Sequence, residues 1–400
     1  MMNHLGRLIL WQRAKDYLTK HHPLTIGIAG SSGKTIAKAA VNAALSSNYQ
    51  VRSQASSYDA PIGMAMTVLG ITKHTVRANW YRLLTASKLT EFSKPEPDVI
   101  VLEVGADRPG DIDKVATQLP FGGAVITNVQ SSHLRLFTNK DLIAHEMKSL
   151  VIDVPPSGFV VLNADDPYVI SMADASRAPV ITYGSDPAAN VRLVRSQSLT
   201  PAGFACEIKI KGKLHELHLP QIVADYHLSH FLAALAVASA LDIDINKVIP
   251  KLQNLIMPPG RMSLLDGHNY SVLIDDTYNA SPESTQAALS VLGSYPAKRR
   301  IAILGDILDL GAHTIPAHRK IGEQVAHVAN VLICVGPNAK HIGSAALHQP
   351  NIDVHYFAQS QDVGKWLKDF LQPQDAILIK GSRAMNMEET VKQLLANPRV

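Results

Sequence analysis

The chain has 400 residues, of which 46% are hydrophobic and 18% charged, which excludes a disordered or fibrous protein and suits a globular protein of two or three domains. Lys and Arg number 38 against 34 Asp and Glu, a formal charge of +4, and no dense basic block is present, so we expect no nucleic-acid partner. No run of about 18 apolar residues occurs, so we expect no membrane-spanning helix. The two cysteines, Cys206 and Cys334, are far apart and lie in no Cys-x-x-Cys pair, which favours a reducing cytoplasm.

Residues 1–22 are expected to form a helical lead. The apolar residues between Leu5 and Leu18 roughly follow helical spacing, and basic residues lie between them. The apolar stretch is too short and too interrupted for a signal peptide. We expect this helix to dock on its own domain, and a helix lying on a membrane surface is the alternative.

After Pro23, short apolar runs alternate with helical stretches, which is typical of βαβ units and a parallel sheet. The pattern predicts strands at residues 25–28, 99–103 and 124–127, a helix at 34–45, a small antiparallel patch within 191–219 and an alanine-rich helix at 227–241. We expect this first α/β domain, with its parallel sheet, to span residues 23–257.

The break Pro258-Pro259-Gly260 is typical of a domain linker. A second α/β series follows it, with strands predicted at 271–274, 300–304, 331–335, 354–357 and 376–379. Its size and alternation predict a Rossmann-like C-terminal domain over residues 258–400. The expected fold class is therefore α/β throughout.

The segment from Gly27 to Thr35, Gly-Ile-Ala-Gly-Ser-Ser-Gly-Lys-Thr, follows a short apolar strand and opens a helix, as a phosphate-binding loop does. Its backbone N–H groups would face phosphate oxygens, Lys34 would reach the β- and γ-phosphates of a nucleotide, and the Thr35 hydroxyl would ligate Mg²⁺. The candidate nucleotide-binding residues here are Gly30, Ser31, Ser32, Gly33, Lys34 and Thr35. A glycine-rich turn of purely structural use is the alternative.

This spacing of glycines resembles the Mur ligase family, which carries Gly-x-x-Gly-Thr-x-Gly-Lys-Thr there, and Ser31 keeps the hydroxyl of the family's Thr. Further strings similar to the MurF branch of that family follow in the same order almost to the C-terminus. They are residues 101–106, 109–112, 128–129, 161–167, 259–261, 274–280, 304–306, 310–311, 380–383 and 387–388. The shared order argues against chance, and the resemblance covers roughly residues 23–400.

The resemblance implies a phosphate-loop Mur ligase central domain over 23–257 and a C-terminal ligase domain over 258–400. It implies an ATP- and Mg²⁺-dependent ligase of peptidoglycan precursor synthesis that forms an amide bond through an acyl phosphate. In the MurF branch there are two substrates. One is a muropeptide, UDP-N-acetylmuramoyl tripeptide, which supplies the carboxylate, and the other is D-alanyl-D-alanine, which supplies the amine. We therefore expect a cytoplasmic enzyme, and we expect it to be a monomer.

The resemblance also gives roles to single residues. Glu103 and His133 each follow a predicted strand, where α/β sheets bind ligands, and match the family's metal-site segments. A solvated surface glutamate and a structural histidine are the alternatives. Arg261 would offset charge on the γ-phosphate, with an ordinary hinge-surface arginine as its alternative. The expected catalytic residues are therefore Lys34, Glu103, His133 and Arg261.

The remaining nucleotide contacts are expected mainly beyond the linker. Asp275 resembles the residue that binds the ATP ribose, and Tyr278 and Asn279 would lie close to the nucleotide. His230 stands where an Asn that recognises adenine is common in the family. Asp276 is a candidate cap for the helix that follows.

Three departures leave the substrate open. Only 22 residues precede Pro23, whereas the MurF branch holds UDP with an N-terminal domain. Met147 takes the place of a carbamylated lysine that bridges the metals in many Mur ligases, and Lys148 is the next residue, so either a small shift restores the role or the second metal site is altered. The pair Tyr226-His227 replaces the family's His-Asn.

Two other functions are alternatives to that of a MurF-type ligase. One is a related ligase that acts on a lipid-linked muropeptide or an amino-acid polymer, and the other is a non-catalytic nucleotide-binding partner subunit. A further similar stretch, 57–63, is given no role.

Overall fold

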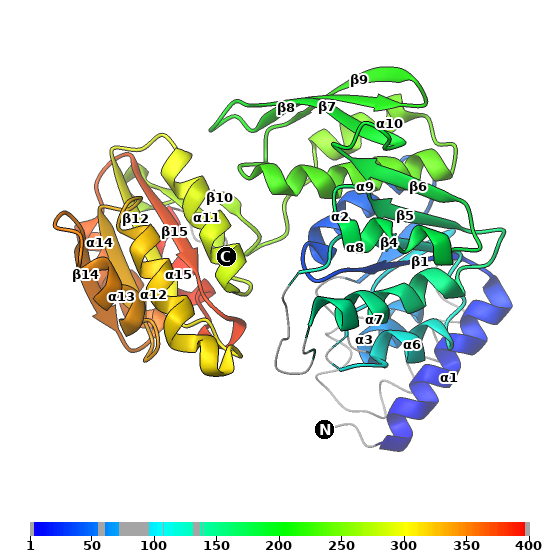
Figure 1. Ribbon diagram of the computed structural model, residues 1–400, viewed down its shortest axis with the longest axis horizontal. Coiled ribbons are helices and arrows are strands. Elements are labelled where there is room, and N and C mark those ends of the chain that lie inside the picture. The colour runs from blue at the N-terminus through cyan, green and yellow to red at the C-terminus, as the bar shows by residue number, and fades with distance from the viewer. Residues whose placement is uncertain are drawn as a thin grey trace. The chain divides into compact units, whose positions relative to one another are not determined.

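The computed structural model describes residues 4–54, 61–71, 96–106, 108–130, 137 and 139–396. The chain divides into two compact units, each with its own sheet (Figure 1). Unit 1 comprises Met1–Ser196, Cys206–Leu217 and His227–Leu255. Unit 2 comprises Gln197–Ala205, His218–Tyr226 and Ile256–Val400. Two short segments that precede Ile256 in the sequence, 197–205 and 218–226, thus belong to the second unit. The stretch 57–63, which is similar to a MurF segment and was given no role, lies largely outside the described residues.

The sheet that begins in unit 1 has nine strands in the order β2-β3-β1-β4-β5-β6-β7-β8-β9. From β2 to β7 every pairing is parallel, as expected for an α/β fold. The bounds are β1 Leu24–Ala29, β2 Val51–Ser53, β3 Val99–Glu103, β4 Gly123–Ile126, β5 Phe159–Asn163, β6 Val180–Gly184, β7 Val191–Ser198, β8 Phe204–Ile210 and β9 Lys213–Leu219. The connections from β7 to β8 and from β8 to β9 are too short for a crossover, so these neighbours run antiparallel, which confirms the predicted patch.

Helices cover both faces of this sheet. Alternate strand residues, such as Ile100 and Leu102, share one core with helices α1 His4–His21, α3 Pro61–Val68, α6 Asp111–Ala116, α7 Lys140–Asp153 and α8 Pro167–Ile170. The other described helices of this part of the chain are α2 Lys34–Leu45, α9 Leu228–Ala240 and α10 Ile245–Gln253, with short 3₁₀ turns at Ala173–Ala175 and Asp225–His227. Helices α2 and α9 pack against each other and against strands of the sheet.

Helix α1 docks on unit 1, as expected from its sequence. Leu10, Ala14, Tyr17 and Leu18 are buried in the core that the helix shares with α3 and the sheet. Among the described residues, no helix combines the length and the hydropathy that crossing a bilayer requires.

Unit 2 contains a six-stranded sheet in the order β10-β11-β15-β12-β13-β14. Only the pair of β10 and β11 is antiparallel; the others are parallel. The strands are β10 Ser263–Asp266, β11 Val272–Asp276, β12 Arg299–Gly305, β13 Val331–Val335, β14 Asp353–Phe357 and β15 Asp375–Lys380. This is the Rossmann-like arrangement predicted for the C-terminal part of the chain.

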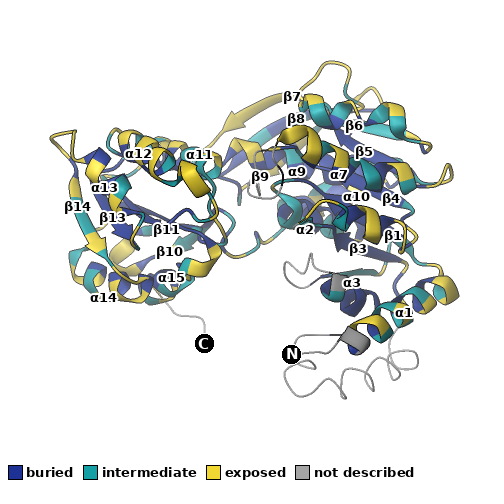
Figure 2. Ribbon diagram, turned by 60° about the horizontal axis from the view of Figure 1, so that its bottom comes forward, coloured by how far each residue is buried: buried dark blue, intermediate teal, exposed yellow. Residues whose placement is uncertain are grey.

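Two separate cores lie on the two faces of this second sheet, and its strands are largely buried (Figure 2). One core contains α11 Pro282–Ser294, α12 Thr314–Val325 and α13 Lys340–Ala346, and the other contains α14 Ser360–Phe370 and α15 Glu388–Leu394. Short 3₁₀ turns occupy His268–Tyr270, Gly311–His313 and Arg383–Met385.

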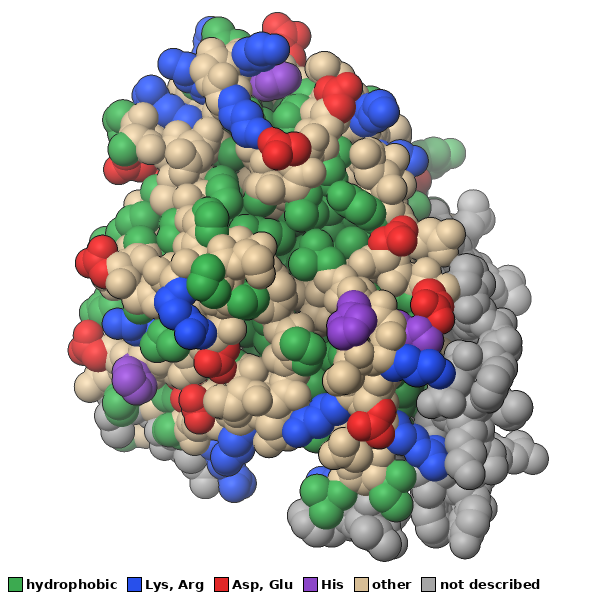
Figure 3. Space-filling model, turned by 90° about the vertical axis from the view of Figure 1, so that its right-hand side faces the viewer, with side chains coloured by type: hydrophobic (Ala, Val, Ile, Leu, Met, Phe, Trp, Pro, Cys, Tyr) green, Lys and Arg blue, Asp and Glu red, His purple; other side chains and the backbone are tan. Residues whose placement is uncertain are grey.

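Among the described residues on the face drawn in Figure 3, basic and acidic side chains are interspersed. This agrees with the nearly balanced charge of the sequence. A surface that tracks a nucleic-acid backbone would gather Lys and Arg in one stripe.

Candidate functional site

The candidate phosphate loop connects β1 to α2, and two of its glycines have positive φ. Gly30 has φ +151° and Gly33, the residue before α2, has φ +77°. A Cβ on Gly30 would lie 1.9 Å from Thr127 Oγ1, and one on Gly33 would lie 2.0 Å from His230 Cε1. Close packing and left-handed backbone therefore both require glycine at these positions.

The middle of the loop is held by the segment that follows β4. The Ser31 amide donates to the backbone oxygen of Asn128 at 3.0 Å, and the Ser32 amide donates to Asn128 Oδ1 at 3.0 Å. Thr127 Oγ1 donates to the Ser32 carbonyl oxygen at 2.8 Å. These two amides are thus engaged within the loop, whereas the first backbone N–H groups of α2 have no intrahelical acceptor.

Lys34 is the first residue of α2, and its side chain folds back onto the phosphate loop. Its Nζ donates to the Gly30 carbonyl oxygen at 2.9 Å, and the contact is only partly buried. A lysine held in this way remains beside the loop and can exchange a carbonyl oxygen for a phosphate oxygen, which carries more negative charge.

Glu103 ends β3 and is buried, with 1% of its surface exposed, so it is not a solvated surface glutamate. Thr35 Oγ1 donates to Glu103 Oε2 at 3.4 Å. Glu103 Oε1 is 2.8 Å from Nζ of Lys38, and the Glu103 amide donates to Gln54 Oε1 at 2.6 Å. The structure therefore brings together Thr35 and Glu103, the two predicted metal ligands that lie in its described part.

Lys38 and Gln54 also belong to this site, and neither was predicted from the sequence. Lys38 follows Lys34 by four residues in α2, so both side chains lie on one face of the helix. That spacing was the available signal. Gln54 follows the three-residue strand β2, and nothing in its local sequence marks it.

The donors present suit Mg²⁺, which prefers oxygen ligands and usually retains waters and phosphate oxygens besides one or two carboxylates. The hydroxyl of Thr35 and the carboxylate of Glu103 are such donors. His133 lies outside the described residues. Within the described part of the chain no three His, Cys, Asp or Glu side chains gather as a metal site of their own.

Met147 takes no part in this site. It lies on α7 and is buried in the hydrophobic core of unit 1, with 5% of its surface exposed. Its neighbour on α7, Lys148, is half-buried. A thioether in an apolar core supplies no hard oxygen ligand, so this position does not provide the bridge that a carbamylated lysine would.

His230 lies on α9 and is buried, with 4% of its surface exposed. Its ring packs directly on Gly33, and the ring centroid is 6.0 Å from that of His227. The structure thus places this candidate nucleotide contact on the phosphate loop.

The four candidates beyond the linker lie together in unit 2. The guanidinium carbon of Arg261 is 3.6 Å from the ring centroid of Tyr278, a cation–π contact. Asp275 is buried and accepts hydrogen bonds from the Gly260 amide at 3.0 Å and from Thr277 Oγ1 at 2.6 Å. Burial raises the pKa of Asp275, and these hydrogen bonds oppose the rise.

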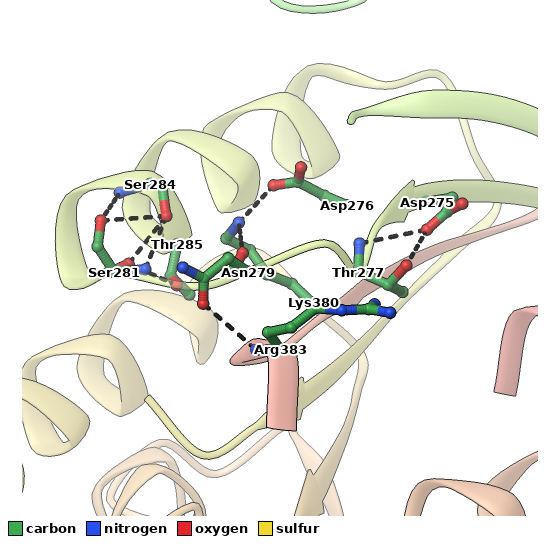
Figure 4. A network of polar contacts seen from close by, with 9 residues as sticks. All are labelled: Asp275, Asp276, Thr277, Asn279, Ser281, Ser284, Thr285, Lys380 and Arg383. Carbon is green, nitrogen blue, oxygen red and sulfur yellow. Dashed lines mark hydrogen bonds and ion pairs between the residues drawn. The ribbon is translucent and has the colours of Figure 1, made fainter. Parts of the chain in front are cut away.

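Lys380 organises the second half of this cluster (Figure 4). Its buried Nζ donates to Asp276 Oδ2 at 2.5 Å and to the Asn279 carbonyl oxygen at 2.9 Å. The Arg383 amide donates to Asn279 Oδ1 at 3.3 Å. The cap of α11 is Ser281, so the suggestion that Asp276 caps the next helix was wrong: its carboxylate pairs with Lys380 instead.

Comparisons with known proteins agree with this arrangement. A ligase of Bacillus subtilis (strain 168) named UDP-N-acetylmuramoyl-tripeptide--D-alanyl-D-alanine ligase is 26% identical over 392 residues, covering 97% of this chain and 79% of the relative. The fold is similar to a crystal structure of MurF from Acinetobacter baumannii, with TM-score 0.82, 23% identity and coverage of 96% and 79%. It is also similar to MurF ligase from Thermotoga maritima in complex with ADP, with TM-score 0.81, 22% identity and coverage of 98% and 84%.

Two family descriptions match the sequence itself. The Mur ligase middle domain matches residues 28–238, which include the phosphate loop, Glu103 and His230. The Mur ligase, glutamate ligase domain matches residues 260–383, which include Arg261, Asp275 and Lys380. The first match alone covers more than half of the chain, and so the chain belongs to the Mur ligase family.

Proposed function

We propose that this chain is a MurF-type ligase, which uses ATP to join D-alanyl-D-alanine to a UDP-N-acetylmuramoyl tripeptide in peptidoglycan precursor synthesis. The observation that carries the proposal is the phosphate loop with Lys34 beside it and, at its end, Thr35 in contact with the buried Glu103. The names of the Bacillus subtilis, Acinetobacter and Thermotoga relatives support it. We assign ATP binding to residues 23–257 and the ligase domain to 258–400.

In this proposal the start of α2 and Lys34 hold the β- and γ-phosphates. An oxygen of the substrate carboxylate attacks the γ-phosphorus, the bond to the β-phosphate oxygen breaks, and ADP and an acyl phosphate form. The amine of D-alanyl-D-alanine then attacks the acyl carbon and loses a proton, and phosphate leaves. Exclusion of water protects the acyl phosphate from hydrolysis.

Thr35 and Glu103 would hold Mg²⁺, which offsets negative charge on the phosphates. We keep His133 as a proposed further ligand, and His230 as a contact of the nucleotide. Arg261 is proposed to offset charge on the γ-phosphoryl group, and Asp275 is proposed to bind the ribose. Tyr278 and Asn279 are proposed to lie near the nucleotide.

One observation favours a second candidate. Met147 lies in the core where a carbamylated lysine would bridge two metals, so the metal site differs from that of many Mur ligases. A related ligase with another carboxylate and amine, such as a lipid-linked muropeptide or an amino-acid polymer, or a non-catalytic nucleotide-binding subunit would be compatible with that change.

Replacement of Lys34 tests the assignment of the loop. Lys34→Met removes the charge that holds the phosphates, and we expect ADP formation in the presence of both substrates to fall by at least about 100-fold. Lys247→Met, at an exposed lysine of α10, serves as the control and should keep the wild-type rate. An unchanged rate of ADP formation in Lys34→Met would refute the assignment.

A further inference from the structure

Lys38 is a buried lysine on the helix that begins at the phosphate loop. Only 4% of its surface is exposed, and its Nζ lies 2.8 Å from Glu103 Oε1 and 2.7 Å from the Gln54 carbonyl oxygen that accepts its hydrogen bond. Removing an ammonium group from water is costly unless an anion compensates the charge. The burial of Lys38 therefore depends on Glu103.

The two carboxylate oxygens of Glu103 have different neighbours. Oε1 faces the ammonium of Lys38, whereas Oε2 faces the hydroxyl of Thr35 at 3.4 Å. The backbone of Glu103 is fixed as well, because its amide donates to Oε1 of Gln54, which is itself buried. The carboxylate is thus held in one orientation, with a single oxygen directed at the residue that ends the phosphate loop.

Helix α2 presents two lysines on one face for two different tasks. Lys34 contacts the loop itself, through the Gly30 carbonyl oxygen, and Lys38, one turn later, contacts the carboxylate at the end of β3. The ammonium of Lys38 already contacts Glu103 and Gln54, so we assign it no role as a second phosphate ligand.

We propose that Lys38 is a positioning residue that determines which divalent cation the site accepts. The inference rests on the proposed function, which places a divalent cation beside Thr35 and Glu103. Because Lys38 holds Oε1, Glu103 can bind the cation through Oε2 alone. Mg²⁺ is small and takes single carboxylate oxygens in an octahedron, whereas Ca²⁺ is larger and readily takes both oxygens of one carboxylate. A lysine on one oxygen thus favours Mg²⁺ over Ca²⁺.

The test measures the affinity of the full chain for a fluorescent ADP analogue, once with Mg²⁺ and once with Ca²⁺. Wild-type protein should bind more tightly with Mg²⁺. Lys38→Met fills similar space without a charge and frees Oε1, so its ratio of Mg²⁺- to Ca²⁺-supported affinity should fall by at least about fivefold, a change well outside binding error. Lys38→Arg keeps a cation on Oε1 and should keep the wild-type ratio.

Thermal unfolding without nucleotide or metal provides a second readout. Lys38→Met leaves the buried carboxylate of Glu103 without its cation and should lower the unfolding temperature, whereas the double variant Lys38→Met/Glu103→Gln, which removes both charges, should recover most of the loss. Should Lys38→Met fail to fold, Lys38→Gln, which is uncharged and polar, takes its place in the binding comparison. Lys247→Met is the control at an exposed lysine.

The outcomes separate this inference from the proposed function. If Lys38→Met loses affinity with Mg²⁺ and with Ca²⁺ by the same factor, or keeps the wild-type ratio, Lys38 has only a structural role and the inference is overturned alone. If wild-type protein binds the ADP analogue equally well without any divalent cation, the proposed metal site fails, and the inference fails with it.

Discussion

Gly33 shows at the scale of one residue how the loop depends on its neighbours. Gly33→Ala would place a methyl group 2.0 Å from Cε1 of His230 at a φ of +77°, so the loop or α9 must move. We expect a loss of about 1–3 kcal/mol in the free energy of unfolding and weaker nucleotide binding. Urea unfolding and ADP binding measure the two effects.

Gly110 offers the matched control. It also has a left-handed φ, +84°, and also precedes a helix, but nothing lies within 4 Å of the position of its Cβ. Gly110→Ala should therefore lower the free energy of unfolding only by the cost of a left-handed backbone at a residue with a Cβ, about 1–2 kcal/mol. Equal losses in the two variants would show that the contact with His230 contributes nothing.

A pH dependence is expected from His318, which is fully buried in unit 2. Its Nδ1 donates to the Thr314 carbonyl oxygen and its Nε2 accepts the Ile307 amide, so the ring is neutral. Burial removes the ring from water, which disfavours its charged form and lowers the pKa of His318. The unfolded chain therefore takes up a proton first as the pH falls below about 6.5, and the folded state loses stability in that window.

Thermal unfolding between pH 5 and 8 checks this expectation. The unfolding temperature of the wild-type protein should fall steadily as the pH falls below about 6.5. The unfolding temperature of His318→Gln should be lower at pH 8 but should fall less over the same interval. Parallel curves for the two proteins would contradict the assignment of this pH dependence to His318.

The local sequence predicted single residues unevenly. Lys34, Thr35 and Glu103 were found because each follows or ends a strand in a recognisable string, and the structure places Thr35 and Glu103 side by side. Lys38 was not found, because its spacing from Lys34 places both lysines on one face of α2 but does not show that Lys38 is buried. Its burial depends on Glu103, a residue more than sixty positions later whose strand lies beside β1.

Helix α1 is the element whose contribution is easiest to isolate. Leu18 is buried against the core of unit 1, with 2% of its surface exposed, whereas Leu8 on the same helix is 54% exposed. Leu18→Ala should reduce the free energy of unfolding by about 2–5 kcal/mol, through lost burial and the cavity left behind.

Leu8→Ala is the control for that variant, since it makes the same chemical change at an exposed site, and it should cost less than about 0.5 kcal/mol. Chemical denaturation measures both. Similar small losses in the two variants would mean that α1 is not part of the cooperative core.

The five parallel strands of the second α/β series were predicted within one or two residues, because buried parallel strands are short apolar runs between helical stretches, whereas the antiparallel strand β10 was not predicted. The predicted strands of the first series were also present, but β2, β5 and β6 were not predicted as strands. β2 has only three residues, too few for a periodic signal. Strand order was beyond the sequence, since β1 pairs with β3 and β4, whose positions depend on distant contacts.

At the scale of the whole molecule, the sequence predicted an α/β protein with two successive series of strands and helices, and the structure confirms that class. The grouping of 197–205 and 218–226 with unit 2 was not predictable, because it depends on contacts remote in sequence. Family resemblance supplied what periodicity could not, namely a reaction and its nucleotide.

The most direct test of the account is product formation by the purified chain. UDP-N-acetylmuramoyl tripeptide, D-alanyl-D-alanine, ATP and Mg²⁺ are incubated with the protein, and mass spectrometry and ADP release follow the reaction. The account predicts the pentapeptide product and one ADP for each amide bond, with neither formed when either substrate is omitted or Lys34 is replaced by Met. ATP that stays intact with both substrates present would contradict it.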